Sequence, residues 1–430
     1  MPANSRELVS PRQTRPAFSW PSRIRTGQIA FYTFWRVCPL LFVLSQGTES
    51  AFSQTAPLPS SAPLPSSAPH PGAAKPPVAN PVPGSLKAQS PKPVVRSAQA
   101  SRTKSDASTA PTLSLVPLQS WNTDAPILSV AISPNGSLVA GGSKEMTVRV
   151  WSVATGKLIQ SLTRQSQGKF GWQEHVVSLA FSKDGAELAA GGDDGVISIW
   201  EIGAGKHLTD LVGHTDQPYG LAFSPDKKTI VSSSGGSSDY SMRLWSVDNG
   251  VQIKNIDLGG IGYSATFSDD GLKVAASGWE TLLVFQFPSM AKIAAFVNGN
   301  RHQATSVVAF SHAGEIVASG GDSGLIRGWD CLTGRLEFEL AATVPTSPSD
   351  FPSRVKALAF SRDDGRLLSI SQNGAVKLWN VKSRKLIAQA VVSQSDVEDL
   401  EPAVSASSDL KIIAVGSKQN KVLLWKVHTQ

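Results

Sequence analysis

The chain has 430 residues, of which 41% are hydrophobic and 17% charged, and its formal net charge is +7 at pH 7. The positive excess lies in residues 1–112, because residues 113–430 contain 28 Lys and Arg against 30 Asp and Glu. A region without net positive charge is a poor candidate for non-specific nucleic-acid binding, so we expect no nucleic-acid partner. Removal of Cys38 with an N-terminal signal would leave Cys331 alone, and no intramolecular disulfide could then form.

Residues 1–53 have the order of a secretory signal. Six arginines and a single acid, Glu7, precede the apolar run Val37 to Leu44, and Ala51-Phe52-Ser53 follows. This pattern predicts cleavage after Ser53 and export to the periplasm or the extracellular space. The alternatives are an uncleaved membrane anchor, or neither. The wider stretch Ile29 to Leu44 is shorter than the roughly 20 apolar residues of a spanning helix, and any membrane contact would be through it.

Residues 54–112 form a low-complexity segment. The hexapeptide APLPSS occurs twice in tandem, 13 of the 28 prolines fall here, and aromatic residues are absent. Such a composition predicts a disordered, extended linker that separates the following domain from the N-terminus. A proline-rich ligand for another domain is the alternative.

Residues 113–430 contain aromatic anchors that recur at a nearly constant interval. Each ends a short apolar run, and the seven are Trp151, Trp200, Trp245, Phe285, Trp329, Trp379 and Trp425. Their spacings are 49, 45, 40, 44, 50 and 46 residues. A period of about 40–45 residues with several short strands per unit is typical of a propeller with four-stranded blades.

A second frame recurs in phase with the anchors. It reads AISPNG at Ala131, AFSKDG at Ala180, TFSDDG at Thr266, AFSHAG at Ala309 and AFSRDDG at Ala359. Asn135-Gly136, Asp184-Gly185 and Asp270-Gly271 predict two-residue hairpin turns, since these residues tolerate positive φ.

The third unit, LVGHTDQPYGLAFSPDKKTIVSSSGGSSDYSMRLWSV, closely resembles a WD40 repeat. The resemblance covers residues 113–430, extends to exported WD40 proteins of bacterial type, and implies an all-β, seven-bladed WD40-like β-propeller. In that family a His, a Ser or Thr, an Asp and the Trp often form a hydrogen-bonded chain. Only the third unit offers the full set, which is His214, Ser232, Asp239 and Trp245. We interpret it as a buried structural bridge; a catalytic pair of His214 and Asp239 is the alternative.

The other units depart from this set. The second keeps Asp194 and Trp200 but has Trp172 where the His would be. At the Asp position the remaining units carry Glu145, Trp279, Ser323, Asn373 and Gln419. The departures predict that most blades depend on packing and turns.

The ring closes through an added strand. After Trp425 only KVHTQ remains, which is too short for a fourth strand, whereas LSLVPLQSW at Leu113 to Trp121 is strand-like and unassigned. We expect residues 113–121 to form the outer strand of the last blade, which leaves no open seam and predicts a monomeric propeller.

No catalytic or metal-binding pattern rises above background. The chain has no G-x-S-x-G, P-loop or H-E-x-x-H motif, its seven His are scattered, and Cys331 has no His nearby in sequence. We therefore expect no enzyme and no cofactor, and predict a non-catalytic protein-interaction scaffold on a flexible stalk. The alternative is an envelope enzyme or a small-ligand-binding propeller with a site in the central channel.

The family resemblance implies a partner on the face around the channel. By alignment on the AFS frame, the positions before each first strand include His175, Val177, Gln217, Tyr219, Ile261, Tyr263, Arg354, Lys356 and Glu398, with Tyr240 and Trp279 in neighbouring loops. Aromatic residues and Arg dominate binding hot spots, so Tyr219, Tyr263, Trp279 and Arg354 are the leading candidates. The alternative is that these side chains pack the loops.

Overall fold

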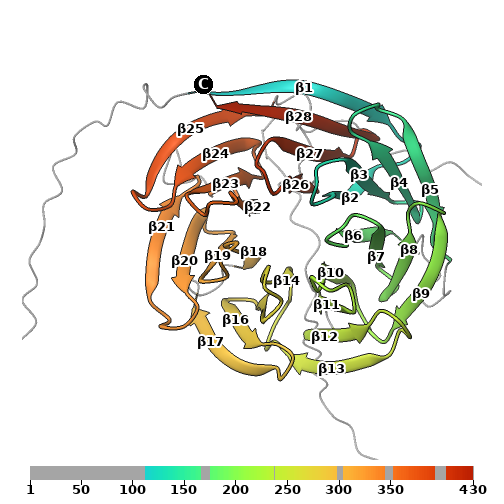
Figure 1. Ribbon diagram of the computed structural model, residues 1–430, viewed down its shortest axis with the longest axis horizontal. Coiled ribbons are helices and arrows are strands. Elements are labelled where there is room, and N and C mark those ends of the chain that lie inside the picture. The colour runs from blue at the N-terminus through green and yellow to red at the C-terminus, as the bar shows by residue number, and fades with distance from the viewer. Residues whose placement is uncertain are drawn as a thin grey trace, which may run out of the picture. The chain divides into compact units, whose positions relative to one another are not determined.

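Seven four-stranded antiparallel sheets form the part of the chain that the computed structural model describes, which is residues 112–165, 175–236, 238–297, 304–343, 352–392 and 403–429. The sheets are arranged as blades around a common axis (Figure 1). This confirms the all-β, seven-bladed propeller. The expected signal or anchor in residues 1–53 and the linker up to residue 111 lie outside the described residues.

Each blade contains four strands, numbered outward from the axis except in the last blade, where β1 is the outer strand. The innermost strands are β2 (Ile127–Ile132), β6 (Val176–Phe181), β10 (Pro218–Phe223), β14 (Ala265–Phe267), β18 (Thr305–Phe310), β22 (Val355–Phe360) and β26 (Val404–Ala406). The second strands are β3 (Leu138–Ser143), β7 (Glu187–Gly192), β11 (Thr229–Ser234), β15 (Lys273–Ser277), β19 (Ile316–Gly321), β23 (Arg366–Ser371) and β27 (Ile412–Ser417).

The anchors lie on the third strands, which are β4 (Thr147–Ser152), β8 (Val196–Glu201), β12 (Ser241–Ser246), β16 (Thr281–Gln286), β20 (Leu325–Asp330), β24 (Ala375–Asn380) and β28 (Lys421–Thr429). The outer strands are β5 (Leu158–Thr163), β9 (Lys206–Val212), β13 (Gln252–Asp257), β17 (Ala291–Val297), β21 (Leu336–Ala341), β25 (Lys385–Val391) and β1 (Leu113–Asn122). Among the described residues, no helix is long and apolar enough to cross a membrane.

The hairpin between the two inner strands follows one design in most blades. In the first blade the Gly136 N–H donates to the Ser133 carbonyl (2.8 Å), and the Asn135 side chain accepts from Ser133 Oγ (2.8 Å) and the Ser137 N–H (3.0 Å). Gly136 has φ 71°, whereas Asn135 is not in the positive-φ region. The predicted two-residue turns are therefore wrong. Five residues separate β2 from β3, and the Asn or Asp holds the turn through its side chain.

The hydrophobic core is a ring of interfaces rather than a central mass. The described residues form seven buried clusters, and each joins two neighbouring blades. The anchor of each blade packs against the preceding blade, as Trp200 does with Leu162 and Trp245 with Leu211. Six anchors are buried, but Trp425 in the last blade is only partly buried. A single blade therefore has no core of its own.

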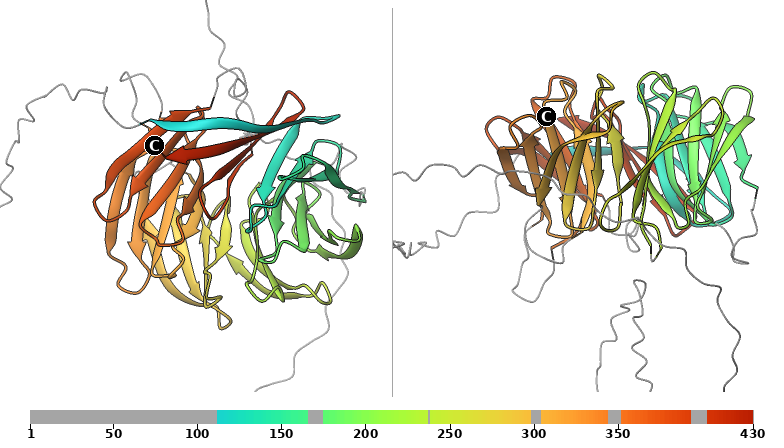
Figure 2. Two further views of the ribbon diagram at one scale, coloured as in Figure 1. Left: turned by 45° about the horizontal axis from the view of Figure 1, so that its top comes forward. Right: turned by 90° about the horizontal axis from the view of Figure 1, so that it is seen from below.

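The two ends of the described propeller pair in the last sheet. Strand β1 lies beside β28 in antiparallel register, from Leu113 opposite Thr429 to Asn122 opposite Lys421, with one irregularity between Pro117 and Gln119. Figure 2 shows β1 in cyan alongside the red end of the chain.

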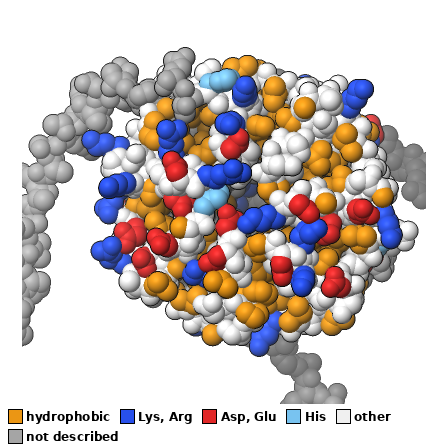
Figure 3. Space-filling model, in the orientation of Figure 1, with side chains coloured by type: hydrophobic (Ala, Val, Ile, Leu, Met, Phe, Trp, Pro, Cys, Tyr) orange, Lys and Arg blue, Asp and Glu red, His pale blue; other side chains and the backbone are white. Residues whose placement is uncertain are grey.

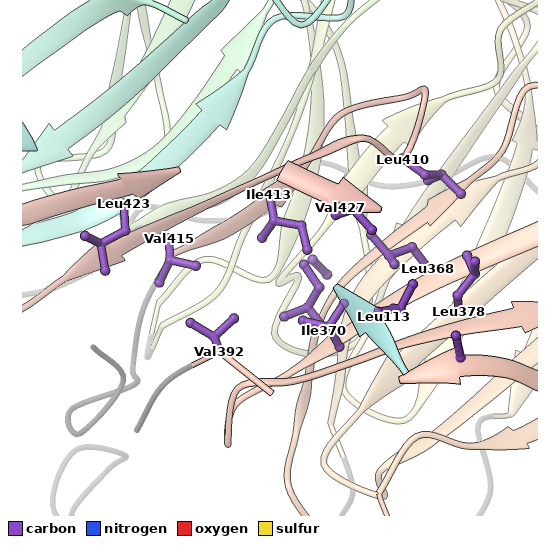
Figure 4. Packing of buried hydrophobic residues seen from close by; sticks show 13 residues of the cluster. Leu113, Leu368, Ile370, Leu378, Val392, Leu410, Ile413, Val415, Leu423 and Val427 are labelled. Carbon is purple, nitrogen blue, oxygen red and sulfur yellow. The ribbon is translucent and has the colours of Figure 1, made fainter. Parts of the chain in front are cut away.

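Two apolar contacts fix β1 at its ends. Trp121 stacks on Trp151 of the first blade, with ring centroids 5.2 Å apart, and donates from Nε1 to the Gly156 carbonyl (2.8 Å). At the other end Leu113 enters the cluster between the sixth and seventh blades, near Ile413 and Val427 (Figure 4). Strand β1 therefore contacts both neighbours of the closing seam.

We expect deletion of residues 113–121 to lower the melting temperature of the whole propeller. The deletion exposes the edge of β28 and removes Trp121 from Trp151, so two inter-blade clusters lose members. Thermal unfolding followed by circular dichroism measures the effect. Val116→Ala, at a side chain that is 44% exposed on the same strand, is the matched control and should shift stability by no more than about 0.5 kcal/mol. A deletion variant that melts at the wild-type temperature would contradict the closure.

Candidate functional site

The third blade contains a buried chain of four hydrogen-bonded side chains. Trp245 Nε1 donates to Ser232 Oγ (2.8 Å), Ser232 Oγ lies 2.6 Å from His214 Nε2, and His214 Nδ1 lies 2.7 Å from Asp239 Oδ2. Because Ser232 already accepts from Trp245, its hydroxyl donates to Nε2 of a neutral His214 whose proton is on Nδ1. His214 and Ser232 are fully buried, so the set bridges strands and offers no opening to a substrate.

Electrostatics favour the same protonation states. Burial lowers the pKa of His214, although the Asp239 carboxylate opposes that shift. Burial acts against the charge of Asp239, but hydrogen bonds from His214 and Ser241 outweigh it and hold the pKa of Asp239 well below its usual range. The bridge at neutral pH is therefore a neutral imidazole on a carboxylate, which is a structural arrangement.

The second blade replaces this bridge with an ion pair that the sequence analysis missed. Arg164 directly follows β5, and its buried Nη2 donates to Asp194 Oδ1 (2.9 Å) and Oδ2 (3.2 Å) and to the Val196 carbonyl (2.8 Å). The side chains of Arg164 and Asp194 have no exposed surface. Arg164 thus contacts Asp194 of the second blade as His214 contacts Asp239 of the third.

The AFS frame predicts Trp172 at this position. Trp172 lies outside the described residues, as does Glu398. The sequence feature that could have identified Arg164 is its position directly after the outer strand of the preceding blade, which is similar to the position of His214 after β9. The connection from β5 to β6 is longer than that from β9 to β10, so counting back from the AFS frame passed over Arg164. In the sixth blade a shorter version of the bridge remains, since Trp379 Nε1 donates to Ser369 Oγ (2.9 Å).

The ring has two chemically different ends. We call the end with the connections between blades and the loops between second and third strands the crossover end. The end with the hairpins between innermost and second strands is the hairpin end. At the crossover end a cavity of about 240 Å³ is lined by residues that include Tyr219, Tyr263, Lys356 and Val177. The predicted partner-binding residues Tyr219, Tyr263 and Lys356 therefore converge on one opening.

The two tyrosines supply the aromatic part of this opening. Their ring centroids lie 5.6 Å apart, and both side chains are half-buried. Burial raises the pKa of Tyr263, so its phenol is a neutral hydrogen-bond donor at physiological pH. Arg354, close enough to Tyr263 to influence its ionisation, forms an ion pair with Asp322, and these two side chains are 35% and 29% exposed. The opening thus combines aromatic surface with cationic groups.

The remaining predicted positions do not line this cavity. His175 Nδ1 lies 3.1 Å from Asp193 Oδ2, which ties it to the loop of its own blade. Tyr240 is 42% exposed in the loop before β12, and Trp279 is half-buried in the loop before β16. They occupy the crossover end at a greater distance from the axis.

The described residues contain no group of three or more His, Cys, Asp or Glu side chains placed to hold a metal ion. Cys331 is fully buried against the fourth blade, and burial raises its pKa to about 11. A thiol in that state is a poor nucleophile.

Two family models match the chain. Residues 116–299 match the family described as nucleolar protein 10-like, N-terminal domain, a β-propeller. Residues 295–330 and 346–380 match the WD domain, G-beta repeat. Together with the seven four-stranded sheets, these matches make the chain a WD40-repeat, seven-bladed β-propeller.

Similar proteins share only part of their length with the chain. A U3 small nucleolar RNA-associated protein 15 homolog of Xenopus tropicalis is 29% identical over 179 residues, which are 41% of this chain and 32% of that protein. Transcription initiation factor TFIID subunit 5 of Caenorhabditis elegans is 22% identical over 50% of this chain and 31% of that protein. A target of rapamycin complex subunit of Schizosaccharomyces pombe is 25% identical over 48% of this chain and 62% of that protein.

We expect the free energy of unfolding to fall as the pH is lowered from 7.5 to 5.5, partly through His214. Because burial depresses the folded-state pKa of His214, the unfolded chain binds an extra proton below about pH 6.5, and that proton stabilises the unfolded state. The share contributed by Asp239 disappears only below about pH 3.9. Urea unfolding at both pH values measures the decline.

His214→Gln should show a smaller decline than wild type, because residue 214 then binds no proton in either state. His207→Gln, at a side chain that is 47% exposed on β9, is the control for loss of an imidazole at the surface. An equal decline in wild type and His214→Gln would contradict the role of burial at His214.

Proposed function

We propose that the chain is a non-catalytic protein-interaction scaffold that binds a protein partner at the crossover end. The observation that carries this proposal is the convergence of Tyr219, Tyr263 and Lys356 on one cavity beside Arg354. Large aromatic rings with cations at their edge are the residue types that dominate protein–protein binding energy. Rigid strands hold Tyr219 and Lys356, so little order is lost on binding.

The similar proteins support a role in assemblies. Two of them are named as subunits, one of a transcription initiation factor and one of a target of rapamycin complex, and the third is named as RNA-associated. For this chain we propose a protein partner rather than a nucleic acid. Its propeller region has 30 acidic against 28 basic residues, and non-specific nucleic-acid binding depends on cationic surface.

We expect replacement of Tyr219, Tyr263, Trp279 and Arg354 with alanine to abolish partner capture while the propeller stays folded. The full chain serves as bait in affinity capture, and circular dichroism checks the fold. A matched variant replaces four exposed side chains of the outer rim, Val251, Ile253, Leu332 and Leu336, with alanine and should retain the partner. Lys356→Glu adds a single charge reversal at the cavity and should weaken capture with less effect on packing. Identical partners for wild type and both crossover-end variants would refute the site.

We also propose that the propeller is exported and carried on a stalk formed by residues 54–112. The support is the order of charge and hydropathy in residues 1–53 and the proline content of the segment that follows. N-terminal sequencing of the protein from the envelope or medium should give a chain that begins at Gln54. An intact N-terminus in a membrane fraction would favour the anchor, and an intact N-terminus in the cytoplasmic fraction would contradict export.

A further inference from the structure

A second cavity lies at the hairpin end, away from the residues of the proposed partner site. Its volume is about 530 Å³, within the roughly 300–1,000 Å³ of small-ligand sites. Innermost strands and hairpins from all seven blades contribute to its lining. The view down the axis shows a hollow with basic and acidic side chains around it (Figure 3).

One position of each hairpin turn forms the mouth of this cavity. It is the residue after the Ser that opens the turn, and each of the seven blades contributes one. The charged members are Lys183, Asp269, His312 and Arg362, and the uncharged members are Pro134, Pro225 and Ser408.

The turn geometry frees this position for binding. In the second blade the Ser182 hydroxyl donates to Asp184 (2.7 Å), and in the sixth the Ser361 hydroxyl donates to Asp363 (2.5 Å). These turn carboxylates also accept backbone N–H groups, so they are committed to the hairpin and do not line the cavity. In these two turns, the side chain of the residue between Ser and Asp makes none of these turn hydrogen bonds.

Among the described residues that line the cavity, Asp269 is the only acid, and basic side chains lie beside it. Lys183 Nζ lies 3.9 Å from its carboxylate and donates to its backbone carbonyl (3.1 Å), while His312 Nε2 lies 3.8 Å from Oδ2. Arg362 forms no ion pair with any residue that the structure describes. Between Arg362 and Lys183, through the seventh and first blades, the described lining residues of the turns are Ser408, Pro134 and Asn135, all uncharged. Arg362 is therefore an exposed cation without a neighbouring acid in the lining.

Apolar side chains line part of the cavity interior. Leu179, Leu221, Phe223 and Phe267 of the innermost strands line it beneath the charged mouth. Leu179 and Leu221 also line the cavity at the crossover end, so these two side chains lie between the two cavities. Such a lining accepts an apolar body and gives it a favourable transfer from water.

We propose that the hairpin end is a binding site for a carboxylate carried on an apolar body. The planar guanidinium of Arg362 matches a carboxylate in a two-point hydrogen bond, and the apolar body lies against Leu179 and Leu221. A single unpaired guanidinium suits one negative charge better than the two of a phosphate. The carboxylate belongs either to a small organic acid or to an acidic residue of a peptide.

The test is a ligand-observed NMR titration of the full chain with 3-phenylpropionate. We expect saturable binding, with much weaker binding of 3-phenylpropanamide, which lacks the charge, and of acetate and inorganic phosphate, which lack the apolar body. Arg362→Glu should weaken binding about tenfold or more. Arg366→Glu makes the same change of net charge at an exposed residue of the same blade outside the lining, and should stay within about twofold of wild type.

The source of the carboxylate follows from a second titration with the peptide acetyl-Asp-Phe-Asp-amide. Binding at least tenfold tighter than that of the free acid would assign the site to a polypeptide, and weaker binding to a small acid. The proposal is overturned if 3-phenylpropionate does not saturate by about 10 mM, if the amide binds equally well, or if the two glutamate variants behave alike. Because no crossover-end residue is altered, capture of the partner by the same variants reports separately on the proposed function.

Discussion

Everything in this propeller depends on the packing of each anchor against the preceding blade. Trp151 stacks on Trp121 and Trp329 stacks on Phe296, with the same interplanar angle of 16° in both pairs. Burial of such a ring contributes about 1.5–3 kcal/mol, and the aromatic pairing adds about 0.5–1.5 kcal/mol. Because each anchor is buried by the neighbouring blade, the anchors are all buried only when the ring is complete. The closing strand β1 therefore serves the first blade as much as the seventh.

At two neighbouring interfaces between blades, buried polar bridges fix the position of the connecting segments. His214 with Asp239 and Arg164 with Asp194 each join the end of an outer strand to a loop of the next blade. A buried ion pair is weak evidence for net stability, because desolvation offsets most of the attraction. Its effect is geometric: the partners fix where a crossover connection enters the blade. The connection held by Arg164 leads to β6. The connection held by His214 leads to β10, which carries Tyr219.

The sequence was informative wherever one residue performs the same task in every blade. The anchors, including Phe285, were visible because each ends an apolar third strand at a constant period. Convergence of Tyr219, Tyr263 and Lys356 followed from their equivalent places at the start of the innermost strands. Arg164 could not be predicted from spacing, because the connection from β5 to β6 differs in length from that between β9 and β10. Counting back from the AFS frame gave Trp172 instead. The turn type was misjudged because Asn-Gly also fits a longer hairpin in which Asn acts through its side chain rather than through positive φ.

The same inner strands present different chemistry at their two ends. Leu179 and Leu221 line both cavities, yet two tyrosines mark the crossover end, whereas several charged side chains of both signs mark the hairpin end. At the hairpin end of the second and sixth blades, the Ser and the Asp that hold the turn are separate from the residue that faces the cavity. Substitution at the facing position changes the charge of the mouth without removing a turn hydrogen bond. Recognition at this end can therefore vary independently of stability, because the core lies between blades and not in the mouth.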